Sequence, residues 1–247
     1  MITDGKHFPA DPDRFVFDSE VSRVFENMAK RSIPMYAEVH RLHAAMVVLS
    51  HPASVEKPLT VYDIGASRGG FLRELCHQCL VPAVSGAPYL TFVAVDSSPA
   101  MLDGLSEEMP WVQTVCSDVL ALPDFSEKAD VISMFYLLQF IQSSADQLSV
   151  LRWVYRNLKP GGLFISGHKG EPTQTFATTF DSLYYAFRRA NGYTQREIEA
   201  KTKALKNSMW PCRPEWLEDQ CYRAGFIDYT ETTRWLQFYT SVCTKGG

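Results

Sequence analysis

The chain has 247 residues, of which 46% are apolar, and a net charge of −4. This length and apolar content suit one sizeable core, which predicts a single domain over residues 1–247. No dense run of lysine or arginine appears, and no apolar run is long enough to span a bilayer, so we expect neither a nucleic-acid nor a membrane partner. Because the N-terminus lacks a basic start and an apolar run, we expect a cytoplasmic protein.

The first region of the chain, residues 1–57, carries helical periodicity. Its apolar positions fall into two stripes, one led by Val21 and Phe25 and the other by Val39 and Leu42. Such spacing is typical of amphipathic helices. We expect these helices to precede the sheet and to form a lid over it.

Residues 58–170 alternate between strand and helix patterns. Strands are predicted near residues 59–63, 90–95, 112–116, 129–135 and 162–166. This alternation indicates a parallel sheet with helices on both faces.

Two further regions follow this core. Residues 171–210 form a helical cap, because the pattern from Thr173 to Met209 is helical except at Asn191-Gly192. Residues 211–247 contain a helix and then alternating residues from Phe226 to Thr244, which predict closing antiparallel strands. The expected fold is therefore α/β, with a doubly wound and mostly parallel seven-stranded sheet.

Six cysteines are scattered along the chain. Cys76 and Cys79 have the spacing of half a zinc site, but the sequence offers no second pair to complete it. Free cysteines are commonly buried as small apolar side chains. We therefore expect no bound metal and no structural disulfide.

A glycine-rich turn follows the first predicted strand. Gly65 and Gly69 allow a tight turn, after which a helix directs its free N–H groups toward the crevice. A dinucleotide fingerprint is excluded because Ser67 occupies its middle glycine position. Asp96 ends the second strand, where one carboxylate can accept hydrogen bonds from both hydroxyls of a ribose. These signals predict a ligand that carries a nucleoside.

The order of four motifs resembles that of class I methyltransferases, which bind S-adenosyl-L-methionine. The motifs are Asp63-x-Gly65-x-x-x-Gly69, Asp96, Ser117-Asp118 and Asn157-Leu158-Lys159-Pro160-Gly161-Gly162. The resemblance implies a Rossmann-like methyltransferase fold with S-adenosyl-L-methionine as cofactor.

Further segments resemble one subgroup, the carboxy-S-adenosyl-L-methionine synthases, which supply a modified cofactor for tRNA wobble uridine modification. They include Arg31-Ser32-Ile33-Pro34-Met35-Tyr36, Leu138-Gln139-Phe140 and Arg189-Ala190-Asn191-Gly192-Tyr193, and the resemblance runs from about residue 15 to residue 245. The cofactor-binding candidates that follow from the motifs and the resemblance are Tyr36, Asp63, Gly65, Ala66, Ser67, Gly69, Asp96, Ser97, Asp118, Val119 and Phe135.

The chain departs from this subgroup at three places. Thr202 stands where the synthases have an arginine that pairs with the extra carboxylate, and Phe135 replaces an asparagine. The Ser-Glu-Lys that ends the fifth strand reads Ser166-Gly167-His168. An unpaired buried carboxylate costs several kcal/mol, so its cation must come from Lys201, Lys203 or Arg68, or the bound cofactor is unmodified.

Two residues are candidates for catalysis. His168 at a strand end is either a general base poised near neutral pH or an exposed loop histidine. Tyr193 either lines the pocket or fastens the cap through hydrogen bonds.

The leading interpretation is a methyltransferase that acts on a small metabolite. The first alternative is synthase chemistry, in which a sulfonium ylide captures carbon dioxide released from prephenate. The second is a cofactor-binding partner subunit without turnover. We further expect a homodimer that forms through the lid and the cap, because their amphipathic helices exceed what the core needs for its own cover.

Overall fold

The computed structural model describes residues 17–206 and 208–247. The start of the predicted lid region and one residue of the predicted cap therefore lie outside the described residues. A seven-stranded sheet forms the centre of the molecule, in the order β3-β2-β1-β4-β5-β7-β6. Its strands are β1 (Leu59–Ile64), β2 (Leu90–Asp96), β3 (Gln113–Cys116), β4 (Ala129–Phe135), β5 (Leu158–Lys169), β6 (Asp228–Trp235) and β7 (Phe238–Thr244).

The strand directions confirm the predicted doubly wound, mostly parallel sheet. β1 to β5 run parallel, whereas β7 pairs antiparallel with both β5 and β6. β1 lies between β2 and β4, so the order of the strands reverses there. In such sheets the ligand crevice opens at the carboxyl ends of the strands beside the reversal.

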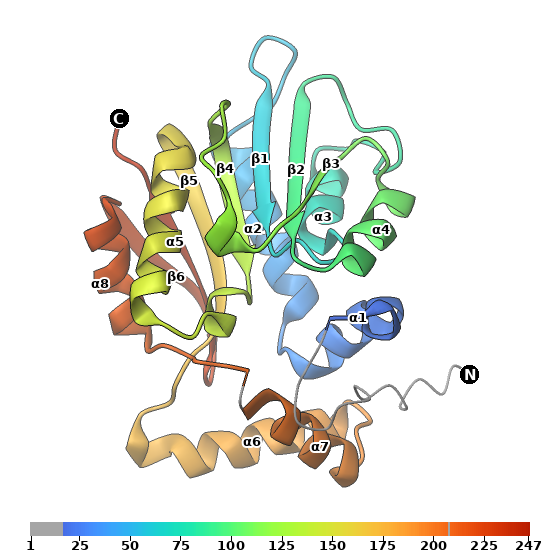
Figure 1. The fold of residues 1–247 in the computed structure, drawn as a ribbon, viewed down its shortest axis with the longest axis vertical. Helices are drawn as coiled ribbons and strands as arrows, with labels where there is room; N and C mark the ends of the chain where they lie inside the picture. The colour runs from blue at the N-terminus through green and yellow to red at the C-terminus, as the bar shows by residue number, and fades with distance from the viewer. Residues whose placement is uncertain (1–16, 207) are drawn as a thin grey trace.

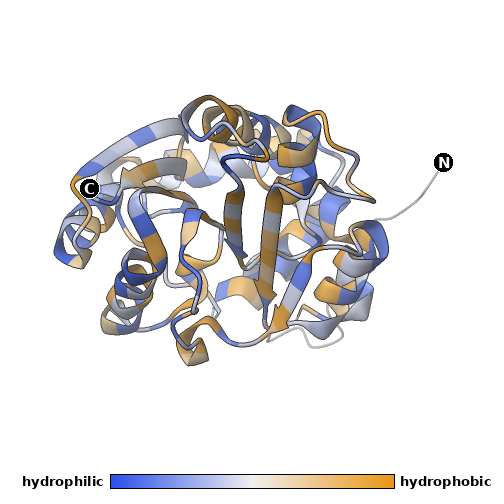
Figure 2. Cartoon of the chain, turned by 90° about the horizontal axis from the view of Figure 1, so that it is seen from above, coloured by the Kyte–Doolittle hydropathy of each residue, from blue (hydrophilic) through white to orange (hydrophobic). Residues whose placement is uncertain are grey.

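Helices cover both faces of the sheet (Figure 1). Alternate strand residues point to opposite faces, so Val61 packs with α2 (Tyr36–Ser50), α3 (Gly70–Gln78) and α4 (Pro99–Glu108), whereas Tyr62 packs with α5 (Ser144–Asn157) and α8 (Pro214–Ala224). Figure 2 shows strands rich in hydrophobic residues at the centre of the molecule and helices of mixed hydropathy around them.

The remaining helices lie beyond the carboxyl ends of the parallel strands. α1 (Ser19–Ser32) is the described part of the lid, and α6 (Ala177–Ala190) and α7 (Gln195–Lys206) form the cap below the sheet in Figure 1. Short 3-10 helices occupy Val119–Ala121, Leu138–Phe140 and Gln174–Phe176.

Capping side chains explain several helix starts. The Asp18 carboxylate accepts a hydrogen bond from the Val21 N–H at the start of α1, and the Ser98 hydroxyl accepts one from Met101 at the start of α4. Both residues satisfy backbone donors that the helix itself leaves free. The starts of α1 and α4 are thus fixed by local sequence signals.

The fifth strand extends beyond its predicted bounds on both sides. It begins at Leu158, which pairs with Ala129 of β4, and it ends at Lys169, which pairs with Phe238 of β7. The sequence predicts that this strand ends near residue 166, three residues too early, because the pairing with β7 continues to Lys169. A lysine therefore does end the strand.

Candidate functional site

A cavity of about 600 Å³ opens at the carboxyl ends of β1, β2 and β4 and extends to the lid and the cap. This volume is within the range of pockets that hold small ligands. Every predicted cofactor-binding residue except Gly69 lines the cavity, namely Tyr36, Asp63, Gly65, Ala66, Ser67, Asp96, Ser97, Asp118, Val119 and Phe135.

The glycine loop is held in left-handed backbone conformations. Gly65 and Gly69 both have φ of +72°, and Ser67 has φ of +48°. The N–H groups of Gly65 and Ala66 donate to the Val95 carbonyl at 2.8 and 3.0 Å, which ties the loop to β2. A side chain at Gly69 would lie 3.0 Å from Leu105, so this glycine shapes the turn from outside the cavity lining.

Asp96 lies at the end of β2 and faces the cavity. Its Oδ2 accepts the Ser67 N–H and its Oδ1 accepts the Ser98 N–H, both at 2.9 Å. Burial raises the pKa of this carboxyl. Because each carboxylate oxygen can accept two hydrogen bonds, both oxygens keep capacity for a ligand. That capacity fits the diol of a ribose.

Asp63 is a second buried carboxyl at the cavity. Burial is the main cause that raises its pKa to about 7, and repulsion from Asp96 adds to it. The Ser133 hydroxyl donates to its Oδ1 at 2.7 Å. A cation bound nearby would lower the pKa of Asp63 again, so this end of the cavity favours a positively charged ligand.

An aromatic wall formed by Tyr36, His40, Phe135 and Tyr136 lines the cavity beside the glycine loop. The Tyr36 ring lies 4.5 Å from that of His40 and 6.3 Å from that of Tyr136, and Phe135 lies 4.7 Å from His40. Burial lowers the pKa of His40 to about 3, so its imidazole is neutral. The electron-rich faces of tyrosine and phenylalanine attract cations such as a sulfonium group.

The polar residues that line the cavity and that sequence reasoning missed include His40 and Gln139. His40 follows Tyr36 by one helical turn, a spacing that could have placed both on one face. Gln139 lies within a motif of the resemblance, and its Oε1 has no hydrogen-bond partner among the described residues. Both are therefore candidate ligand contacts.

The structure corrects the prediction for His168. Its side chain is 1% exposed and stacks on Tyr239 at 5.1 Å, away from the cavity lining. Burial lowers its pKa to about 3. It is therefore neither a general base at the site nor an exposed histidine. The cause is the period of two along β5, which turns His168 into the core and Lys169 toward the cavity.

Tyr193 fastens the cap to the lid, as one of its two interpretations expects. Its hydroxyl lies 3.0 Å from the Ser32 hydroxyl, and the Arg31 guanidinium stacks over its ring at 4.2 Å. Tyr193 does not belong to the cavity lining, so its catalytic assignment has no support from this geometry.

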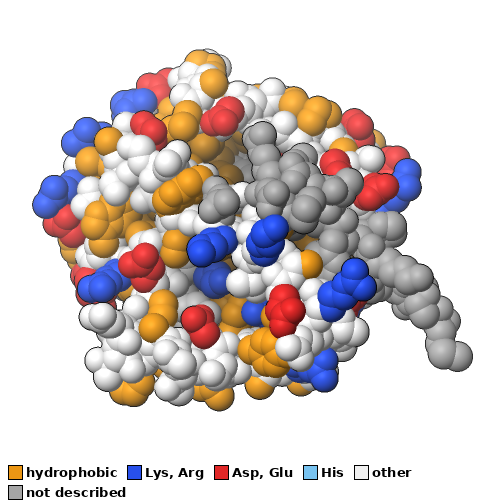
Figure 3. All heavy atoms as spheres, turned by 60° about the horizontal axis from the view of Figure 1, so that its bottom comes forward, with side chains coloured by type: hydrophobic (Ala, Val, Ile, Leu, Met, Phe, Trp, Pro, Cys, Tyr) orange, Lys and Arg blue, Asp and Glu red, His pale blue; other side chains and the backbone are white. Residues whose placement is uncertain are grey.

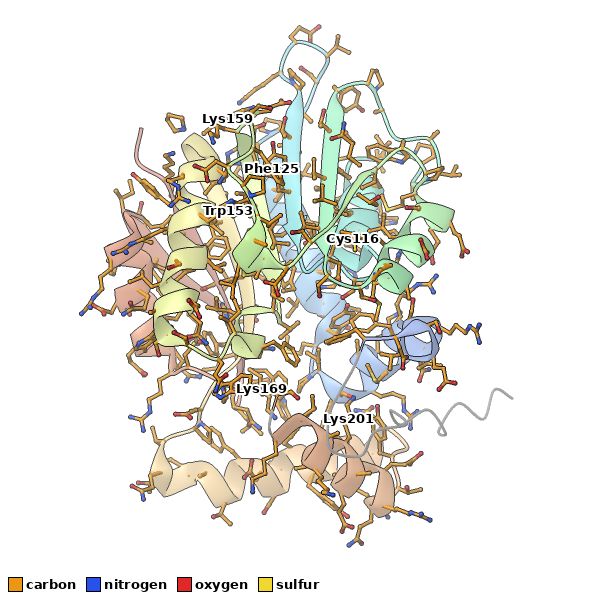
Figure 4. The ribbon with its side chains drawn as sticks, in the orientation of Figure 1. Cys116, Phe125, Trp153, Lys159, Lys169 and Lys201 are labelled. Carbon is orange, nitrogen blue, oxygen red and sulfur yellow. The ribbon has the colours of Figure 1, made fainter. Side chains whose placement is uncertain are left out.

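Of the three cations considered as replacements for the missing arginine, only Lys201 lines the cavity. Arg68 pairs with Glu108 at 2.6 Å instead. Thr202 is exposed, and its hydroxyl donates to the Ile198 carbonyl at 2.7 Å. Lys169 is a further cation at the lining (Figure 4).

Within residues 17–206 and 208–247, no group of three His, Cys, Asp or Glu side chains is placed to hold a metal ion. The helices of these residues include none with the length and hydropathy of a membrane span.

Comparisons with known proteins identify the family. Residues 61–162 match the model of a methyltransferase domain. The chain is 36% identical to a carboxy-S-adenosyl-L-methionine synthase from Trichodesmium erythraeum over 235 residues, which cover 93% of this chain and 88% of that protein. The chain belongs to the carboxy-S-adenosyl-L-methionine synthase family. A synthase from Pseudomonas putida is 32% identical over 241 residues, which cover 92% and 89% of the two chains.

Solved structures with lower identity share the fold of this synthase family. A putative S-adenosyl-L-methionine-dependent methyltransferase from Methanococcus maripaludis aligns with a TM-score of 0.61 at 18% identity and covers 98% of both chains. Human N-acetylserotonin methyltransferase, in complex with S-adenosylmethionine, aligns with a TM-score of 0.59 at 14% identity, covering 93% of this chain and 59% of the other. The predicted resemblance, the methyltransferase fold and a family that uses S-adenosyl-L-methionine are confirmed.

Proposed function

We propose that this protein binds S-adenosyl-L-methionine in the cavity and makes the carboxylated cofactor, the product that the names of its relatives state. The methyl carbon loses a proton and takes up carbon dioxide released from prephenate, and the hydroxide that leaves prephenate in the same decarboxylation takes the proton as water. The proposal is supported by identity that extends over 93% of the chain, well beyond the cofactor-binding core. The methyl carbon next to the sulfonium supplies the reacting centre. The chain's own residues orient the ligand and exclude water.

The residues present fit this ligand. Asp96 would hold the ribose, Asp118 and Val119 would border the adenine, and the glycine loop would allow the methionine part to approach the backbone. The aromatic wall and Asp63 suit the sulfonium charge.

The observation that carries the carboxylation proposal is the position of two cations at the cavity. Lys169 at the end of β5 and Lys201 on α7 both line it. β2, which bears Asp96, and β5 are separated by three strand spacings, on the order of 14 Å. The site thus offers a carboxylate for the ribose at one end and positive charge for an added carboxylate at the other.

Methyl transfer to a small metabolite is the second candidate. It is favoured by Thr202, whose exposed side chain offers no positive charge at the arginine position of the synthases. The small-molecule acceptor, the cytoplasmic location and the homodimer expected from the sequence stay predictions.

Mass spectrometry of products separates the two activities. The protein is incubated with S-adenosyl-L-methionine and prephenate, and separately with S-adenosyl-L-methionine and a panel of small acceptors, with D96A as the control. Formation of the carboxylated cofactor with prephenate supports the proposal. Formation of S-adenosylhomocysteine and a methylated acceptor, without carboxylated cofactor, contradicts it. Binding without any product indicates the partner-subunit alternative.

A further inference from the structure

Basic side chains from four segments converge where the cap meets the cavity. We call Lys169 of β5, Arg188 of α6 and Lys201 of α7 the basic cluster, which Arg31 of α1 borders. Arg188 and Lys201 are each only 8% exposed. Figure 4 shows Lys169 and Lys201 between the lower edge of the sheet and the cap helices, and Figure 3 shows further basic side chains on this face.

The hydrogen-bond partners of the basic cluster are neutral. Lys201 Nζ donates to the Ser32 hydroxyl at 2.8 Å, and an Nη of Arg188 donates to the Thr202 hydroxyl at 3.2 Å. The Nε of Arg188 is buried without a hydrogen-bond partner among the residues that the structure describes. Arg188 and Lys169 lie over the Tyr184 ring at 4.3 and 4.9 Å.

No carboxylate of the described residues forms an ion pair with the basic cluster. Among the charged groups that act on it, Asp181 on α6 is acidic and acts on Lys169, whereas Arg31 on α1 adds positive charge. The rings of Tyr184 and Tyr193 also face it. Buried charges are normally paired, so this arrangement lacks an anion.

Burial and repulsion between neighbouring cations make the charged forms of Lys169 and Lys201 less favourable. Burial, followed by repulsion from Arg188, lowers the pKa of Lys201 to about 7 and that of Lys169 to about 8. An anion placed between them would restore both charges. Titratable groups whose pKa values are shifted by burial and neighbouring charges are often found at ligand sites.

We propose that the basic cluster is an anion subsite in which Lys201 and Lys169 bind the added carboxylate of carboxy-S-adenosyl-L-methionine. This inference rests on the proposed function and names the residues that make the ligand specific. Arg188 acts from behind as a positioning residue, held by Tyr184 and Thr202. Lys201 thus lies one residue before Thr202, the position at which the synthases have their arginine. One residue along α7 turns the side chain by about 100° around the helix axis.

Affinities for the two cofactors test the subsite. Calorimetry compares S-adenosyl-L-methionine and carboxy-S-adenosyl-L-methionine on the native protein, K201M, K169M and K206M, the last a control for an exposed lysine of the same helix. We expect K201M and K169M each to weaken the carboxylated cofactor by about 10- to 100-fold and to change the unmodified one by less than about 3-fold. K206M should change neither.

Proton uptake on cofactor binding is a second test, because it would not differ between the two cofactors if Lys201 had only a structural role. Titrations at pH 8 in two buffers of different ionisation enthalpy measure protons taken up on binding. The carboxylated cofactor should take up more protons than the unmodified one, and the excess should fall in K201M. If K201M does not fold, K169M carries the same test.

Equal losses for both cofactors in K201M and K169M, or no loss for either, would overturn the subsite. A native protein that binds neither cofactor would contradict the proposed function itself. A native protein that binds both cofactors equally would contradict the subsite alone.

Discussion

Asp96 illustrates how a single residue is prepared for a ligand. Its carboxylate is held by the N–H groups of Ser67 and Ser98, each at 2.9 Å. The Ser67 N–H reaches it because the loop adopts a positive φ at that residue. The backbone therefore fixes the direction of the remaining acceptor sites before any ligand binds.

Replacing Asp96 with alanine should weaken the binding of S-adenosyl-L-methionine by about 2–4 kcal/mol, because two charge-assisted hydrogen bonds to the ribose are lost. D96N should lose less, since the amide oxygen still accepts. Calorimetry measures the affinities, and D103A, an exposed acid on α4, is the matched control. An affinity of D96A within about 3-fold of the native value would contradict the ribose assignment.

Lys201 should lower the stability of the ligand-free protein. Its pKa is lowered to about 7 in the folded state, whereas the unfolded chain holds the proton up to about pH 10. Between about pH 7 and pH 10 the unfolded state thus binds more protons than the folded state. The free energy of unfolding of the native protein therefore increases as the pH is raised through this range. Below pH 7 the folded protein carries the full cost of the buried charge.

The variant K201M should therefore be more stable than the native protein below pH 7, by about 1–3 kcal/mol after loss of the Ser32 hydrogen bond. Urea unfolding at pH 6 and pH 9 measures the difference, which should shrink at the higher pH. A K201M variant that is less stable at pH 6 would show that Lys201 is chiefly a structural link between cap and lid.

His168 should matter for acid stability and leave turnover unchanged. The pKa of His168 is about 3 in the folded protein, whereas in the unfolded chain it is about 6.5. Below about pH 6.5 the unfolded chain therefore binds an extra proton. The free energy of unfolding then decreases as the pH is lowered, by up to about 1.4 kcal/mol per pH unit. Between pH 7 and pH 4.5, the free energy of unfolding of H168F should decrease by about 2–3 kcal/mol less than that of the native protein. The variant should keep native turnover at pH 7. Urea unfolding at both pH values and a turnover assay provide the check. A large loss of turnover in folded H168F would show that His168 contributes to the activity of the site.

At the scale of elements, an ion-pair network fastens the lid. Arg73 of α3 pairs with Glu26 of α1 and, at 2.9 Å, with Glu108 of α4. The Ser22 hydroxyl of α1 donates to the Ala100 carbonyl of α4 at 2.8 Å. α1 supplies Phe25, Met28 and Ala29 to the cavity lining, so these contacts help to close the site.

Replacing Arg73 with methionine should loosen the lid and weaken cofactor binding about 3- to 10-fold, because the partly buried Glu26 and Glu108 lose a shared cation. Protection of α1 against limited proteolysis should fall in parallel. R223M, which breaks an exposed ion pair with Asp219 on α8, is the control. Unchanged affinity and protection would show that packing alone holds the lid.

At the scale of the whole molecule, the cap leaves apolar side chains on the surface. Phe176 is 53% exposed and Leu183 on α6 is 48% exposed. Exposed apolar surface on one element can mark a protein interface. We expect a homodimer that buries this part of the cap, as the sequence predicts.

Light scattering at tens of micromolar should give the mass of a dimer, and the double variant F176S/L183S should shift it toward the monomer. V55S, at an exposed apolar residue of the segment between α2 and β1, serves as the control. A monomeric native protein would refute the interface.

Local sequence signals were enough for the cofactor half of the molecule. The strand and helix periodicities, the glycine turn and Asp96 all act within a few residues, and strand ends of a parallel sheet meet at one edge. The positions of Gly65 and Asp96 at one cavity could therefore be predicted from the order of the strands, whereas Asp63 and Ser67 followed from the resemblance to class I methyltransferases.

The other half of the site depended on the tertiary structure. Whether His168 or Lys169 faces the cavity is set by the ladder with β7, a partner about seventy residues away, and a shift of one residue exchanges the two faces. Whether Lys201 or Thr202 faces inward is set by how α7 packs on α1 and α6, which the resemblance could not determine. The sequence determined the fold and the position of Asp96 and the glycine loop at one end of the cavity, because those depend on local signals. Only long-range packing decided which cations stand at the other end.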